Sequence, residues 1–178
     1  MARINGVELK AVKKYTGHEG VCAQGNVYYK GKKLGFWSQD SWGGPDEFDF
    51  DKSVLDKAAQ DYQAGFPDTY KYKDYCSCKD VFLYDILKLR DIECDLNKGF
   101  RKGYKTAIYV TDGYHISWIF CLKDDKDEEL IRSHKEVIDN LEKTMFKDEK
   151  KNVFVFRQND FDMTIDADHP AHALFMAN

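Results

Sequence analysis

Two histidines and two aspartates lie close together near the end of the chain, in the run Asp166-Ala167-Asp168-His169-Pro170-Ala171-His172. Imidazole and carboxylate groups at this spacing are the kinds of ligand that bind a divalent metal ion such as zinc. The run is also typical of a flexible polar tail, which cannot preorganise ligands unless it docks on the rest of the molecule. The tail interpretation is favoured, so His169 and His172 stay candidate metal ligands and no cofactor is expected.

Two other groups have the residue types of metal or catalytic sites. Cys76 and Cys78 are separated by one residue, whereas paired zinc ligands usually have at least two residues between them and need a second pair. Free thiols are therefore expected, with a reactive Cys78 at a helix start as the alternative. His18 and Glu19 lie between glycines, where the pair could do acid–base chemistry. The chain has no glycine-rich phosphate loop, nucleophile elbow or His-Glu-x-x-His motif, so a binding protein is expected over an enzyme.

A tryptophan in a loop is the main candidate for a binding residue. The segment from Asp40 to Pro45 contains glycine and proline, and Trp42 lies inside it. An exposed loop tryptophan is typical of a binding anchor, while a tryptophan folded back as a lid on the core is an equal alternative. The acids Asp40, Asp46 and Glu47 would complement a basic partner. We therefore expect these four residues to contact a protein partner.

Basic residues cluster in a different part of the sequence. Lys98, Arg101, Lys102 and Lys105 could contact a phosphate backbone, although most such groups are plain solvated surfaces. The formal net charge of −4 gives no support to a protein that wraps nucleic acid through a bulk positive field. Local contact with nucleic acid therefore stays open as an alternative.

The composition is that of a folded domain. The chain has 178 residues, of which 43% are hydrophobic, and its 12 Phe and 11 Tyr are too many for a disordered protein. No stretch approaches the roughly 18 apolar residues that span a bilayer, and the first residues lack the apolar core of a secretory signal. We therefore expect a soluble cytoplasmic protein with no membrane contact. Its five cysteines are expected to stay reduced, with Cys94 and Cys121 as small apolar fillers.

The first part of the chain is predicted to form strands and then helices. Ser53 is expected to cap a helix that ends at Gly65, and Ser77 to cap a second helix that runs to Leu89. A separate short helix is expected from Asp91 to Lys102. The hydrophobic alternation predicts strands at 7–15, 26–29 and 33–39, a turn at 30–32 and an extended segment at 47–51.

The second part contains a hairpin signal. Asp112-Gly113 lies between two β-rich runs, which predicts a hairpin over 106–121 with a two-residue turn. This turn places Tyr109 opposite Ile116 and Ala107 opposite Trp118 on a buried face, with His115 and Ser117 on the other face. The pattern then predicts an amphipathic helix at 127–146 and strands at 152–157 and 161–165.

The order of these elements predicts an α+β fold, in which an antiparallel sheet has helices packed mainly on one face. No internal repeat or linker is present, so residues 1–178 are expected to form a single domain. A loosely held C-terminal tail is expected from about residue 166.

The segment from His18 to Phe50, HEGVCAQGNVYYKGKKLGFWSQDSWGGPDEFDF, resembles the opening of small accessory proteins carried by bacteriophages and mobile elements. Some of these proteins are similar to type II anti-CRISPR proteins, which inhibit Cas9. The resemblance carries no active-site motif, so it transfers no functional residue. It implies an inhibitor of host defence that acts by binding.

Three hypotheses follow for the function. The first is an anti-defence protein of a phage or mobile element, which binds Cas9 with its guide RNA in the bacterial cytoplasm and inhibits it without catalysis. The second is a metal-dependent nuclease that uses the histidines and aspartates of the tail. The third is a nucleic-acid-binding accessory protein that uses the basic cluster. The missing catalytic motifs and the resemblance favour the first hypothesis.

Overall fold

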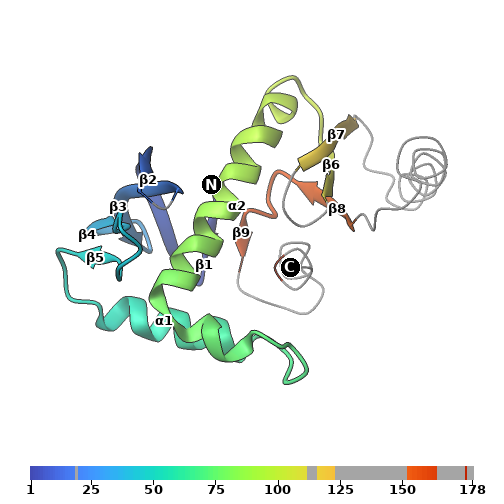
Figure 1. The fold of residues 1–178 in the computed structure, drawn as a ribbon. Helices are drawn as coiled ribbons and strands as arrows, with labels where there is room; N and C mark the ends of the chain where they lie inside the picture. The colour runs from blue at the N-terminus through green and yellow to red at the C-terminus, as the bar shows by residue number, and fades with distance from the viewer. Residues whose placement is uncertain (19, 112–115, 123–151, 164–174, 176–178) are drawn as a thin grey trace.

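The computed structural model describes residues 1–18, 20–111, 116–122, 152–163 and 175. Within this part, two β-sheets lie on either side of a long helix (Figure 1). The elements are β1 (Arg3–Ile4), β2 (Val7–Gly17), β3 (Gly20–Tyr29), β4 (Lys32–Ser38), β5 (Glu47–Phe48), α1 (Ser53–Ala64), the 3₁₀ helix η1 (Lys73–Ser77), α2 (Lys79–Phe100), β6 (Thr106–Thr111), β7 (Ile116–Leu122), β8 (Asn152–Arg157) and β9 (Asp162–Met163).

The first sheet has the strand order β5-β4-β3-β2-β1-β9. Neighbouring strands are antiparallel from β5 to β1, while β9 runs parallel to β1. β3 begins at Gly20 rather than at the predicted Asn26, because it pairs along nearly the whole of β2. In the β3–β4 turn, Lys30 has a φ of 48° and Gly31 a φ of 80°, as a type I′ turn requires. The predicted turn at 30–32 is therefore confirmed.

Helix α1 starts at Ser53, but Ser53 is not its cap. The N-cap position is Lys52, which makes no side-chain cap hydrogen bond, and the backbone N–H and the hydroxyl of Ser53 both donate to the carboxylate of Asp51 at 3.0 Å. The helix ends at Ala64, and Gly65 follows it as predicted. Its buried face consists of Leu55, Ala58, Ala59 and Tyr62.

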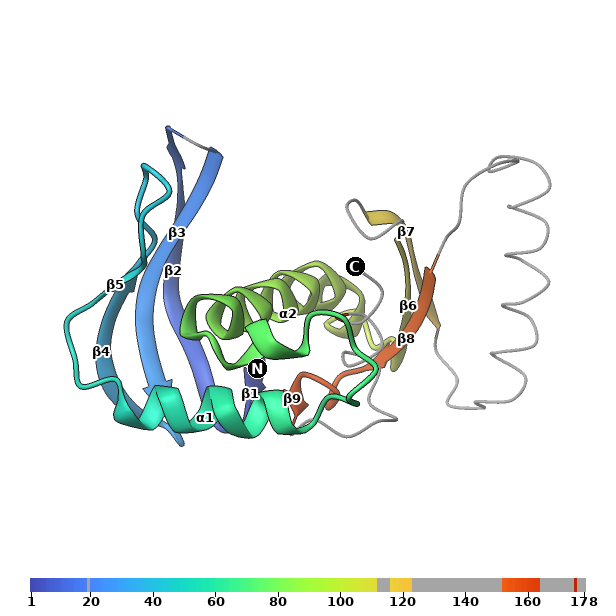
Figure 2. The same cartoon turned by 60° about the horizontal axis from the view of Figure 1, so that its bottom comes forward.

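Helix α2 is one helix of 22 residues where the sequence predicted two. Its buried stripe continues through Ile86, Leu89, Ile92 and Leu96, and spacings of three or four residues keep these side chains on one face. The predicted boundary near residue 90 is wrong because no glycine or proline interrupts the chain before Gly99. α2 contacts β1 and β2 of the first sheet and β6 and β7 of the second (Figure 2). It therefore joins the two sheets.

The second sheet has the order β7-β6-β8, and both of its pairings are antiparallel. β6 and β7 form the predicted hairpin, but Thr111 is paired with Ile116, Tyr109 with Ile119 and Ala107 with Cys121. The predicted register, and the two-residue turn on which it was based, are therefore wrong. The prediction for the side chains of His115 and Ser117 falls outside the part of the chain that the structure describes.

One core cluster includes buried residues from both sheets and both helices. The ring of Phe156 in β8 stacks on Phe161 with centroids 5.4 Å apart, and Phe161 meets the edge of Phe100 at 6.4 Å. Phe175 is the described residue of the predicted tail, and it is buried, with its carbonyl accepting the Tyr70 hydroxyl at 3.0 Å. The loosely held tail expected from about residue 166 stays a prediction, since only this residue of it is described. A single domain over 1–178 stays a prediction.

The described elements confirm the predicted α+β class, with α2 packed on the inner face of the first sheet. β8 coincides with the predicted strand at 152–157, and β9 is a short part of the strand predicted at 161–165. The helix predicted at 127–146 lies outside the described residues. Among the helices that the structure describes, none has the length and apolar character needed to cross a membrane.

Candidate functional site

The loop between β4 and β5 is built around the carboxylate of Asp40. One oxygen accepts the backbone N–H of Trp42 at 3.1 Å, and the other accepts the backbone N–H of Gly44 at 2.8 Å. A Cβ on Gly44 would lie 2.2 Å from Asp40 Oδ2, so the bond requires a glycine unless the Asp40 side chain moves. These bonds fix the backbone on both sides of Trp42. Asp40 thus has a structural role in the loop beside its predicted partner contact.

Asp46 connects the far end of this loop to the core. The indole N–H of Trp37 donates to Asp46 Oδ2 at 2.6 Å, and Trp37 is fully buried. Burial raises the pKa of Asp46 to about 6, with the charge of Asp80 adding to the rise and the Trp37 hydrogen bond opposing it. Asp46 is therefore a half-buried anchor of the loop.

The tip of the β2–β3 hairpin packs against the same loop. The backbone N–H of His18 donates to the carbonyl of Ser41 at 2.8 Å. A Cβ on Gly17 would lie 3.0 Å from backbone atoms of Ser41, so the close approach depends on a glycine. The imidazole of His18 stacks on the indole of Trp42 with centroids 4.5 Å apart and planes 26° apart. Trp42 is thereby held in place while its side chain stays 70% exposed.

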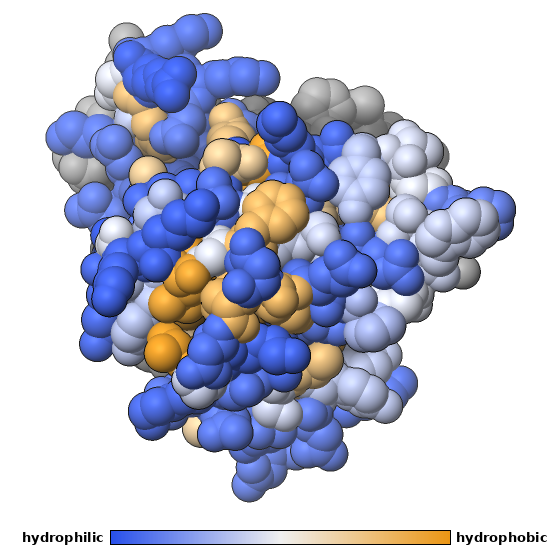
Figure 3. All heavy atoms as spheres, turned by 90° about the vertical axis from the view of Figure 1, so that its left-hand side faces the viewer, coloured by the Kyte–Doolittle hydropathy of each residue, from blue (hydrophilic) through white to orange (hydrophobic). Residues whose placement is uncertain are grey.

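We call the exposed side chains of His18, Val21, Trp42 and Glu47 the tip surface. Val21 follows Gly20 at the start of β3 and is 72% exposed, and Glu47 is the exposed first residue of β5. Hydrophobic side chains gather among hydrophilic ones on the outward side of the first sheet (Figure 3). An aromatic and apolar surface with a charged neighbour has the composition of a protein interface.

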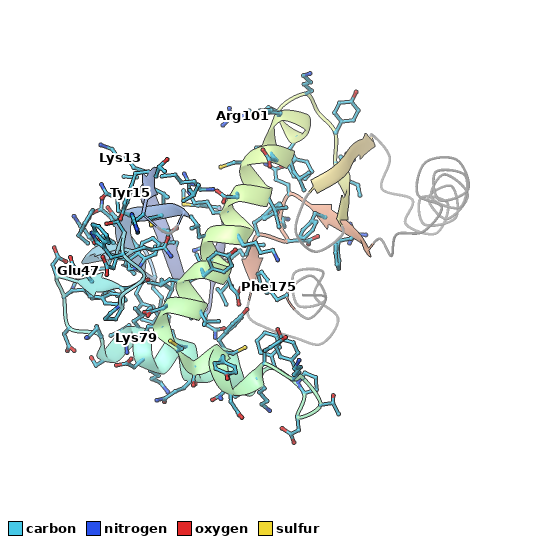
Figure 4. The ribbon with its side chains drawn as sticks, in the orientation of Figure 1. Lys13, Tyr15, Glu47, Lys79, Arg101 and Phe175 are labelled. Carbon is cyan, nitrogen blue, oxygen red and sulfur yellow. The ribbon has the colours of Figure 1, made fainter. Side chains whose placement is uncertain are left out.

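Tyr15 shows that the predicted acids gather at this end of the sheet. Its hydroxyl donates to the backbone carbonyl of Gln39, and Tyr15 and Glu47 lie on the same side of the molecule (Figure 4). The pKa of Tyr15 is raised first by burial and then by neighbouring acidic groups, which include Asp40, Asp46 and Glu47. The structure therefore brings these three acids and Trp42 together, with Glu47 as the most exposed charge.

The four basic residues of the other predicted contact lie elsewhere. Lys98 is in the last turn of α2, while Arg101, Lys102 and Lys105 follow the helix, and all four side chains are exposed. Arg101 lies at the opposite end of α2 from Lys79 and far from Glu47 (Figure 4). The two predicted contact groups therefore belong to separate surfaces.

The candidate metal ligands His169 and His172 lie outside the described residues. Within the described part of the chain, no three His, Cys, Asp or Glu side chains gather in a way that could hold a metal ion. The metal site in the tail therefore stays a prediction.

The four cysteines whose side chains are described are free thiols, two of them buried and two exposed. Burial is the main cause that raises the pKa of Cys76 to about 11, which makes it a poor nucleophile. Cys94 is exposed, so the prediction that it fills an apolar gap is wrong. The side chain of Cys121 lies outside those that the structure describes.

His18 and Val21 are the members of the tip surface that the sequence did not assign to binding. The sequence paired His18 with Glu19 as possible acid–base residues. The glycines at 17 and 20 indicate a tight turn, and a turn between two strands is a signal for an exposed hairpin tip. Nothing local in the sequence indicates that the loop with Trp42 packs against that tip.

Comparison with known protein families, curated proteins and solved structures found no match to this chain. Among the described residues, the tip surface presents an aromatic side chain, Trp42, that is exposed and held in place.

Proposed function

We propose that this protein works by binding a protein partner through the tip surface, without catalysis. The observation that carries the proposal is Trp42, which is 70% exposed although its backbone and its ring are both held. An exposed tryptophan normally gains free energy by burial, and burial of about 150–250 Å² of aromatic surface is a large contribution to an interface. A partner with a matching pocket would bury this side chain.

Preorganisation strengthens this argument. A mobile tryptophan loses conformational freedom when it binds, and this loss weakens the complex. In this protein the Asp40 carboxylate fixes the loop backbone, and the His18 ring supports one face of the indole. Much of the ordering cost is therefore met during folding, which favours the role of Trp42 as a binding hot spot.

Charge supports a partner with a basic surface at this position. Glu47 is exposed, and Asp40 and Asp46 add negative charge behind it. Charge complementarity of this kind chiefly raises the association rate and the specificity of a complex. The rate of association should therefore fall with increasing salt.

The partner that we propose is Cas9 with its guide RNA, in the cytoplasm of a bacterial host. This choice is supported by the resemblance of residues 18–50 to accessory proteins of phages and mobile elements, and by the basic character expected of a protein that handles nucleic acid. The protein would then be an anti-defence inhibitor that blocks the effector by occupying a surface.

A cleavage assay tests this function. Purified Cas9, guide RNA and target DNA are incubated with increasing amounts of the protein. In a separate incubation, the protein alone is mixed with the DNA, with and without a chelator. We expect cleavage to fall in proportion to the ratio of protein to Cas9, with no DNA degradation by the protein itself. Undiminished cleavage at a large excess of protein would exclude Cas9 as the partner. Chelator-sensitive DNA degradation would instead support the metal-dependent nuclease.

A further inference from the structure

A cavity lies where α2 ends and the second sheet begins. This cavity has a volume of about 510 Å³, and its lining includes Phe100, Tyr104, Lys105, Arg157, Gln158 and Asn159. Pockets of roughly 300–1,000 Å³ are the usual size for small organic ligands and cofactors. The cavity is separate from the tip surface, because its lining includes no residue of the tip surface.

Strand pairing brings the backbones of two basic residues of this lining near each other. Thr106, the first residue of β6, is paired with Arg157, the last residue of β8. Lys105 therefore enters the sheet next to the point where Arg157 leaves it, and both side chains are exposed. The pairing of Thr106 with Arg157 fixes the backbone of Arg157 and of the residue that follows Lys105.

Two further basic side chains lie next to this lining. Arg101 and Lys102 lie in the turn between Phe100 and Gly103, two residues that line the cavity, and both of their side chains are exposed. The backbone N–H of Arg101 donates to the carbonyl of Asn97 at 3.0 Å, so the turn covers a carbonyl at the helix end. The end of α2 therefore presents cations beside the cavity.

One carboxylate lines the cavity together with these cations. Asp160 Oδ2 accepts the backbone N–H of Arg157 at 2.7 Å, and the backbone N–H of Asp160 donates to the carbonyl of Arg157 at 3.1 Å. Asp160 thus closes the turn that follows β8, where its charge is partly offset by the N–H dipole. The lining therefore has two basic residues, Lys105 and Arg157, and one acidic residue, Asp160.

The remaining lining suits a planar ring with polar edges. Phe100 lines the cavity but is only 7% exposed, so the half-buried Tyr104 supplies the aromatic surface on which a ring can stack. Gln158 and Asn159 are exposed side-chain amides that can both donate and accept hydrogen bonds. Lys and Arg are the residues that bind phosphate groups through charge-assisted hydrogen bonds.

We propose that this cavity binds a phosphate-bearing ligand of nucleotide size, with the phosphate at Lys105 and Arg157 and the planar base against Tyr104. Free nucleotides and the phosphorylated end of a single nucleic-acid strand share this chemistry. The cavity would give the protein a binding activity separate from the tip surface.

The test uses the ¹⁵N-labelled full chain and follows backbone amide signals as adenosine 5′-monophosphate, inorganic phosphate or adenosine is added. We expect saturable shifts with the nucleotide, confined to residues around 99–105 and 157–160, and adenosine should bind about tenfold more weakly because it lacks the phosphate. Short oligonucleotides with a 5′-phosphate or a 5′-hydroxyl distinguish the two sources. Tighter binding of the phosphorylated strand than of the mononucleotide assigns the site to strand ends, and the reverse order assigns it to free nucleotides.

Variants separate this site from general charge. The double variant K105Q/R157Q should bind the nucleotide at least about tenfold more weakly, since it removes both proposed phosphate contacts. The control K13Q/K32Q removes the same charge from exposed positions on the first sheet and should stay within about twofold of the unchanged protein. If thermal melting shows that the double variant is unfolded, the single variant K105A replaces it. The proposal is wrong if neither phosphorylated probe binds at millimolar concentration, or if the cavity variant binds as well as the control.

Discussion

Asp85 is a buried carboxylate with a raised pKa. The Tyr62 hydroxyl donates to Asp85 Oδ2 at 2.7 Å, and Tyr62 itself is fully buried. Burial raises the pKa of Asp85 to about 6, while the Tyr62 hydrogen bond and the charge of Lys88 oppose the rise. The folded protein therefore binds a proton at Asp85 more tightly than the unfolded chain does.

This difference predicts a pH dependence. Between the ordinary pKa of 3.8 and about 6, the unfolded chain loses the Asp85 proton first, so the stability of the folded state falls as pH rises through this interval. Asp85→Asn cannot ionise and keeps an acceptor for Tyr62. Relative to the variant, the unchanged protein should lose on the order of 2 kcal/mol of unfolding free energy across the interval. Urea unfolding at several pH values measures this, and parallel pH profiles would contradict it.

Thr106 carries a hydroxyl in the core beneath the second sheet. The residue is fully buried, and its Oγ1 has no hydrogen-bond partner within the described residues. Thr106→Val keeps the shape and removes the desolvated hydroxyl, so we expect unchanged stability or a gain of up to about 1 kcal/mol. Thermal melting measures the change, with exposed Thr16→Val as the control. A loss of about 1 kcal/mol or more would show that the hydroxyl is bonded.

For single residues, the sequence indicated which residues lie at the candidate site, but not what each side chain does there. It left open whether Trp42 is a lid on the core or an exposed anchor, and the structure resolves this because Trp37 occupies the core while Trp42 stacks on His18. It assigned Asp40 and Asp46 only a contact with a basic partner. Their bonds to loop and core atoms depend on the folded path of the chain, which spacing alone does not reveal.

Among the elements, the short strand β5 is held against β4 at a glycine. Phe36 and Asp49 exchange hydrogen bonds between the two segments, and a Cβ on Gly35 would lie 2.3 Å from Asp49 Oδ1 and 2.6 Å from a ring carbon of Phe50. The close approach therefore depends on Gly35. It also fixes the end of the loop that carries Trp42.

Gly35→Ala should push β5 and the residues after it away from β4. We expect a loss of about 2 kcal/mol of unfolding free energy, because overpacking forces side chains and backbone to shift. Ser38→Ala in the same strand is the control and should change stability by less than about 0.5 kcal/mol. Denaturant unfolding of both variants gives the comparison. Equal stability of the two would show that this contact is not tight.

The boundaries of the elements were predicted correctly where they depend on a few neighbouring residues of the sequence. The β3–β4 turn at Lys30-Gly31 was correct, since Gly31 adopts the positive φ that the turn needs. The end of α1 before Gly65 was also correct, although Gly65 itself keeps a φ of −72° that any residue can adopt. The division of α2 was wrong because its polar residues after Leu89 lie on the same helix as a continuing buried stripe. The hairpin register was wrong because pairing over the whole length of β6 and β7 decides it, not the turn residues alone.

Over the whole molecule, α2 is the element that connects everything else. It packs between the two sheets, with the tip surface on the first sheet and the cationic cavity where α2 meets the second. The sequence predicted the α+β class, but not the parallel pairing of β1 with β9 or the burial of Phe175. These contacts join the beginning of the chain to its end, and no local pattern records them.

The central claim is that Trp42 binds the partner, and the affinity of variants for Cas9 with guide RNA tests it most directly. Trp42→Ala is compared with Tyr75→Ala, since Tyr75 is an aromatic residue of η1 with a similar exposed fraction of 65%. Both variants should melt like the unchanged protein, because both side chains are exposed. We predict that Trp42→Ala weakens the complex by about 2 kcal/mol, or roughly 30-fold, while Tyr75→Ala stays within about twofold. A folded Trp42→Ala protein that binds as tightly as the unchanged one would contradict the account.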